Sequence, residues 1–134
     1  MAEPKTRRTD DNVDEYLATV GEPRRSQAGT VREIMTRVTG QPAVMWGNMI
    51  GFGDRNDGGP RSHDWFVLGF APRAAALTIY GVRGAYDELA ASDRLGRHTT
   101  GKGCLYFRSL DGVDLAVLES VVTRAWEQQS DPAQ

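Results

Sequence analysis

The chain has few of the residues that usually carry redox or metal chemistry. Its 134 residues include one cysteine and two histidines. A single cysteine cannot form an internal disulfide, and three such residues offer no zinc-ligand spacing. We therefore expect no disulfide framework, no bound metal and no cofactor.

Long apolar and long basic segments are also missing. No apolar run approaches the roughly 18 residues that a membrane-spanning helix needs. Residues 1–12 are polar and of mixed charge, unlike a secretory signal. Lysine and arginine form no long run and do not alternate with aromatic residues, so nucleic-acid binding is not expected. These features predict a cytoplasmic protein without a nucleic-acid or membrane partner.

What is present is the composition of one small globular domain. Hydrophobic residues make up 40% and charged residues 25%, and the formal net charge is -2. The charge is uneven, because residues 61–108 hold seven basic and four acidic residues, whereas residues 109–134 hold one basic and five acidic. The middle of the chain is therefore the part that would attract a small anion.

The spacing of apolar residues predicts helices near both ends. Apolar residues recur at helical intervals over 13–20 and again over 31–38, where Gly40 is expected to end the helix. Asp111 is expected to cap a last helix whose apolar face spans 115–126.

Between these helices the apolar period shortens, which indicates strands. Short apolar segments bounded by turn residues occupy 43–46, 49–52, 65–70, 76–82 and 104–107. No regular alternation of strand and helix appears, so we predict an α+β domain. Its mostly antiparallel sheet would be a meander plus one later strand, flanked by N-terminal and C-terminal helices.

The ends of the chain are predicted to lie outside this domain. Residues 1–10 have nothing to bury and are expected to be a disordered leader. The domain is expected to span 11–127, followed by a frayed tail over 128–134. The turn-rich segment 54–63 is expected to be its most mobile loop.

A glycine-rich segment beginning at Gly96, with the sequence GRHTTGKGCLYF, nearly spells a nucleotide-binding P-loop. Gly103, however, stands where a serine or threonine would hold magnesium. A helix is expected before the segment and a strand after it, which reverses the P-loop order. Nucleotide binding is therefore not expected. The glycines suit a turn, and the amides of such a turn, together with Arg97 and Lys102, would make an anion-binding nest.

We expect a small anionic or carboxylate ligand to bind between this segment and two aromatic strands. The expected ligand-binding residues are Trp46, Arg73, Tyr80, Arg97, His98, Gly101, Lys102, Gly103 and Cys104. Alternatives remain open: Trp46 and Tyr80 could be core anchors. Cys104 could be a small buried hydrophobe, or a nucleophile if a neighbouring cation lowered its pKa.

Three motifs, in the same order along the chain, resemble the YdhG-like domain family. They are Pro42-x-Val44-x-Trp46-Gly47 with Ile50-Gly51-Phe52-Gly53, then Gly69-Phe70-x-Pro72-Arg73 with Leu77 and Tyr80, then residues 95–106. The resemblance extends from Val13 to Trp126. It implies a small bacterial α+β domain with an antiparallel sheet, in a family mostly without assigned activity.

One branch of that family is described as a frataxin-like iron chaperone that supports iron–sulfur and haem assembly. This chain has no dense acidic ridge on its first helix, only Asp10, Asp11, Asp14 and Glu15. We therefore expect a binding module without catalytic residues, and an iron chaperone is the alternative. An uncovered sheet face would favour a homodimer.

Overall fold

The computed structural model describes residues 11–53 and 66–130. Within these ranges lie four α-helices, a short 3₁₀ helix and six strands, which confirms the predicted α+β class. The helices are α1 (Val13–Ala18), α2 (Arg24–Thr39), α3 (Arg83–Glu88), η1 (Ala91–Asp93) and α4 (Leu115–Ser130). The strands are β1 (Val44–Trp46), β2 (Met49–Phe52), β3 (Leu68–Pro72), β4 (Leu77–Tyr80), β5 (Thr99–Gly101) and β6 (Cys104–Phe107). The expected leader, the expected mobile loop and Trp65 fall outside the described residues.

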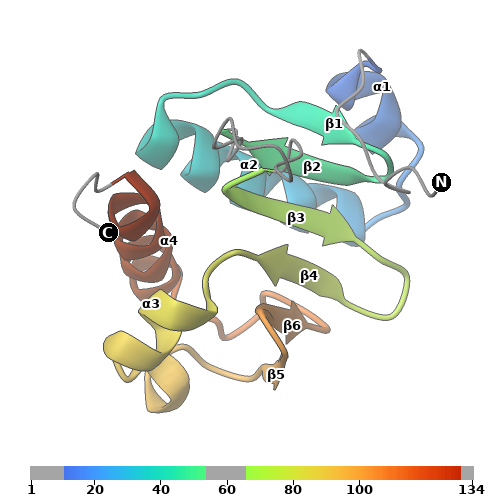
Figure 1. Cartoon of the computed structure of the whole chain (residues 1–134). Helices are drawn as coiled ribbons and strands as arrows, with labels where there is room; N and C mark the ends of the chain where they lie inside the picture. Colours follow the sequence, from blue (N-terminus) through green and yellow to red (C-terminus); the bar gives the residue numbers. More distant parts are fainter. Residues whose placement is uncertain (1–10, 54–65, 131–134) are drawn as a thin grey trace, which may run out of the picture.

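The six strands form one antiparallel sheet in the order β1-β2-β3-β4-β6-β5 (Figure 1). Neighbours along the chain pair as hairpins, and the β5–β6 hairpin joins the meander through β6. Tyr80 is opposite Cys104, and Leu77 is opposite Phe107. This register places the end of β4 beside the start of β6.

One face of the sheet carries the main hydrophobic core. Because side chains alternate along a strand, every second strand residue points to the same face. Ile50, Phe70 and Ile79 share this core with the apolar side of α2 and with α4. In Figure 1, α2 runs behind the strands, and α3 lies near the β5–β6 end.

The opposite face holds a second, smaller hydrophobic cluster. Trp46, Met49, Phe66 and Ala71 are buried in it, with Val44 and Tyr80 packed against it. The rings of Trp46 and Phe66 meet edge to face with their centroids 5.9 Å apart. The central strand β3 therefore has apolar side chains packed on both faces, as predicted, but it spans Leu68–Pro72 and thus begins later than the predicted segment 65–70.

Two glycines provide the flat surface on which Phe66 rests. A Cβ atom at Gly51 would lie 2.6 Å from the Cβ of Phe66, and one at Gly69 would lie 2.7 Å from the carbonyl oxygen of Ile50. Both distances are shorter than any side chain tolerates. The ring of Phe66 thus occupies space that only glycine leaves free.

One predicted helix end agrees with the structure, and another does not. Gly40 ends α2 with a φ of 67°, the left-handed conformation expected there. Asp111, however, does not cap α4, and that prediction is wrong. The carboxylate of Asp114 accepts hydrogen bonds from the amides of Ala116 and Val117. A turn in which Val113 bonds to Leu110 separates the two aspartates.

A charged contact joins α3 to α4. Arg124 donates to both carboxylate oxygens of Glu88, at 3.2 and 3.0 Å, and Gln128 also donates to Glu88. These hydrogen bonds, that of Arg124 foremost, lower the pKa of Glu88 below its ordinary value of 4.5. The helix α4 itself continues to Ser130, beyond the expected domain end at 127.

The Glu88 contact is expected to add to stability at neutral pH and to disappear in acid. A carboxyl group whose pKa is lowered by folding stabilises the fold above its unfolded pKa and loses that effect as the pH falls through its folded pKa. The Glu88→Gln variant should therefore melt below the unmodified protein at pH 7, and the gap should close as the pH falls through the lowered folded pKa of Glu88. Thermal melts over this pH range measure the effect. A gap that widens in acid would contradict it.

Candidate functional site

The glycine-rich segment folds as a hairpin instead of a phosphate-binding loop. Residues Thr99–Gly101 form β5, a strand that the sequence did not indicate, and β6 follows after the two residues Lys102 and Gly103. Gly103 has a φ of 87°, which suits the tight turn. No helix follows the turn, so the geometry of a P-loop is missing, as expected.

His98, one of the predicted ligand-binding residues, is held by internal hydrogen bonds. Its Nδ1 lies 2.7 Å from the carbonyl oxygen of Gly96, and its Nε2 lies 2.7 Å from the hydroxyl of Tyr86. A carbonyl can only accept, so Nδ1 carries the hydrogen, and Nε2 of the neutral ring accepts from Tyr86. Burial of Tyr86 raises the pKa of its hydroxyl, so it stays protonated as a donor. Both ring nitrogens are thus already used.

Cys104 and Gly101 both lie against the side chain of Tyr106. The Cys104 thiol donates to the hydroxyl of Tyr106 at 3.0 Å, and Cys104 is 7% exposed. A Cβ at Gly101 would lie 2.6 Å from the same hydroxyl. Of the two alternatives for Cys104, this burial favours the small hydrophobe.

The structure does not bring all the predicted ligand-binding residues together. Arg73 lies before β4, whereas Tyr80 ends that strand, and the Lys102–Gly103 turn faces the Tyr80 end. The length of β4, roughly 10 Å, therefore separates Arg73 from Lys102. Trp46 is 1% exposed, and its ring contacts that of Phe66, which lies at this end of the sheet. Arg97 and Lys102 are exposed on the hairpin.

At the Tyr80 end of the sheet is a pocket of about 330 Å³, here called the Arg83 pocket. Phe66 and Tyr80, whose ring centroids are 6.0 Å apart, supply an aromatic wall. The other lining residues include Arg83 and the glycines Gly81, Gly84 and Gly103. Tyr80 and Gly103 are therefore the predicted residues that line it.

Arg83 is the charged group of this pocket and is only partly used by the protein. Its Nη1 donates to the carbonyl oxygen of Gly101 at 2.7 Å, and its Nη2 pairs with Asp87 at 3.3 Å. The guanidinium also lies 5.4 Å from the ring centre of Tyr86. Its Nε is buried without a hydrogen-bond partner. A guanidinium has five N–H groups, so unpaired donors remain on a fixed cation.

Sequence reasoning missed Arg83 and Phe66 as pocket residues. The signal that could have found Arg83 is its place, two residues after the glycine that follows β4 and at the start of α3. Gly81 has a φ of 87°, and its amide bonds to the carbonyl of Gly103 at 3.4 Å. That bond ties the α3 start to the β5–β6 turn. Only the pairing of β4 with β6 brings these segments together.

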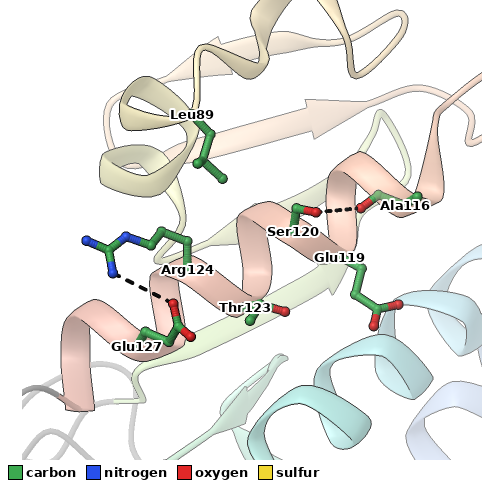
Figure 2. Close-up of a pocket in the computed structure, with 7 residues that line it drawn as sticks. All are labelled: Leu89, Ala116, Glu119, Ser120, Thr123, Arg124 and Glu127. Atoms are coloured by element: carbon green, nitrogen blue, oxygen red, sulfur yellow. Dashed lines mark hydrogen bonds and ion pairs between the residues drawn. The ribbon is translucent and has the colours of Figure 1, made fainter.

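A larger groove of about 560 Å³ runs along α4 (Figure 2). Its charged side chains are already paired. Arg124 contacts Glu88 and Glu127, and Glu119 accepts from Arg37 at 2.5 Å. Ser120 donates back to the carbonyl of Ala116. The groove therefore offers no unpaired charge that would select a ligand.

Comparisons with known proteins do not identify the function of this chain. No protein-family model, curated protein or solved structure matches the chain. Within residues 11–53 and 66–130, no three His, Cys, Asp or Glu side chains are grouped closely enough to hold a metal ion. In the same ranges, no helix has the length and apolar character to cross a membrane.

Proposed function

We propose that this domain binds a small carboxylate ligand with an apolar body in the Arg83 pocket. The observation that carries the proposal is the partly unpaired guanidinium of Arg83 beside the aromatic wall of Phe66 and Tyr80. A guanidinium fork matches a carboxylate with two parallel hydrogen bonds. An aromatic wall with one oriented cation is typical of small-molecule pockets.

Two further features support a ligand of this kind. The contact of Arg83 with Gly101 holds the cation in place before a ligand arrives, which lowers the entropy lost on binding. The three lining glycines carry no side chain, so they present backbone to the pocket. Asp87 takes up part of the positive charge, so a monoanion fits better than a highly charged ligand.

The proposal is tested with benzoate as a probe and benzamide as its neutral counterpart. Benzoate is expected to shift the amide signals of Gly81, Gly84 and Gly103 in an NMR titration, whereas benzamide should bind far more weakly. The Arg83→Lys variant keeps the charge but loses the planar fork. It should weaken benzoate binding about tenfold, which corresponds to about 1.4 kcal/mol.

The matched control is Arg37→Lys, the same change at an exposed arginine that does not line the Arg83 pocket, which should leave benzoate affinity unchanged. Thermal melts confirm that both variants fold. Equal binding of benzoate and benzamide, or an Arg83→Lys variant with full affinity, would contradict the proposal.

Membership of the YdhG-like family and a cytoplasmic location remain predictions. The iron-chaperone alternative also stays a prediction, because no grouping among the described side chains favours it. A ferrous-iron titration of the metal-free protein addresses it separately from the benzoate experiment.

A further inference from the structure

Independently of the Arg83 pocket, we propose that a second cleft, at the opposite end of β4, binds a phosphate group. This cleft, of about 540 Å³, lies between the α1–α2 connection and the β3–β4 turn. Arg24, Arg73 and Arg108 line it, and Glu22 is the only acidic residue among its described lining residues. We call it the arginine cleft.

Arg24 builds the floor of the arginine cleft. Its Nε donates to the carbonyl oxygen of Arg73 at 3.1 Å, and its Nη1 donates to that of Arg108 at 3.2 Å. Its Nη1 also donates to the side chain of Gln27 at 2.7 Å. Because one guanidinium bonds to both carbonyls, the backbones of residues 73 and 108 are held side by side. Arg73 and Arg108, which are distant in the sequence, therefore line the same cleft, and their backbones are held in place.

The side chains of Arg73 and Arg108 remain available to a ligand. Neither guanidinium makes a hydrogen bond or an ion pair with the described part of the protein. Toward residues 11–53 and 66–130, both therefore keep all five N–H donors. In contrast, most other arginines on the described surface have carboxylate partners, as Arg32, Arg37 and Arg124 do.

The one carboxylate in the cleft is directed to other partners. Glu22 accepts from the amide and the hydroxyl of Ser26, at 3.0 and 2.8 Å, and pairs with Arg25 at 3.3 Å. Three arginines and one such glutamate leave the cleft strongly positive. Two unpaired guanidiniums on one cleft suit a phosphate dianion better than a single carboxylate, because each fork can bind two phosphate oxygens.

The test titrates inorganic phosphate into the full chain at constant ionic strength and at pH 7.5, with amide shifts as the signal. Saturating shifts are expected at Val20, Ala74 and Arg108. The Arg73→Ala/Arg108→Ala double variant should bind phosphate at least tenfold more weakly. Glycerol phosphate, titrated in parallel, distinguishes a free phosphate ion from a phosphate ester as the ligand. Tighter binding of either one supports the site and identifies its source.

The charge-matched control is Arg97→Ala/Lys102→Ala, which removes two exposed cations from the other end of the sheet. It should retain full phosphate affinity. No saturable phosphate signal, or equal losses in the two double variants, would overturn the proposal. Because Arg83 takes no part here, a failed benzoate experiment would leave this result unaffected.

Discussion

Replacing Gly69 with alanine is expected to lower the free energy of unfolding by about 3 kcal/mol. The new Cβ would lie 2.7 Å from the carbonyl oxygen of Ile50 and 2.8 Å from the ring of Phe66. The first contact involves backbone of the paired strand β2, which cannot move without loss of its hydrogen bonds to β3. Urea unfolding followed by tryptophan fluorescence measures the change.

Gly29→Ala provides the matched control for Gly69→Ala. Gly29 lies within α2, and nothing comes within 4 Å of a Cβ placed there. Alanine favours a helix over glycine, so this variant should be more stable by about 0.5–1 kcal/mol. The same chemical change would then have opposite signs at the two positions. Similar stabilities for both variants would show that Phe66 does not depend on Gly69.

Replacing Arg24 with methionine is expected to lower the free energy of unfolding by about 2–3 kcal/mol. The substitution keeps much of the apolar stem and removes every donated hydrogen bond. The part-buried carbonyl of Arg73 and the side chain of Gln27 would each lose a charged donor. The backbone carbonyls of Arg73 and Arg108 would no longer accept hydrogen bonds from the same guanidinium. Urea unfolding at pH 7.5 measures the loss.

The neighbouring Arg25→Met variant is the control for Arg24. Arg25 is exposed, and its one ion pair, with Glu22, lies on the surface of the same helix start. Surface pairs of this kind contribute about 0–1 kcal/mol, so little change is expected. Arg24→Lys should recover only part of the stability, because one ammonium cannot span these acceptors. Equal effects at the two arginines would contradict the role given to Arg24.

Most of the fold could be predicted from apolar spacing, and the exceptions have physical causes. Strand β5 was missed because Thr99–Gly101 is short and polar, and it is a strand only through pairing with β6. The start of α4 was misplaced because Asp111 and Asp114 both precede the apolar face. Gly112, with a φ of 77°, lies in the turn between them, and composition alone does not reveal this conformation.

The candidate site was predictable only in part. Motif reasoning found Tyr80 and Gly103, and the β4–β6 pairing places them at the same end of the sheet. It also placed Arg73 and Lys102 in one site. In the structure these two residues lie at opposite ends of β4, so they cannot share a ligand. Arg83 was not predicted, because its suitability for binding a ligand depends on contacts with Gly101 and Asp87 that hold its guanidinium in place.

The strand order also sets a gradient of local stability across the sheet. Strand β3 has a partner on each side, and apolar clusters cover both of its faces, so its amides open to solvent only with the whole fold. Strand β5 pairs on one side alone, and two of its three residues are exposed. The hairpin beside the Arg83 pocket can therefore open locally at small free-energy cost while the central strands stay closed. This domain thus carries its adaptable segment at one edge and its rigid one at the centre.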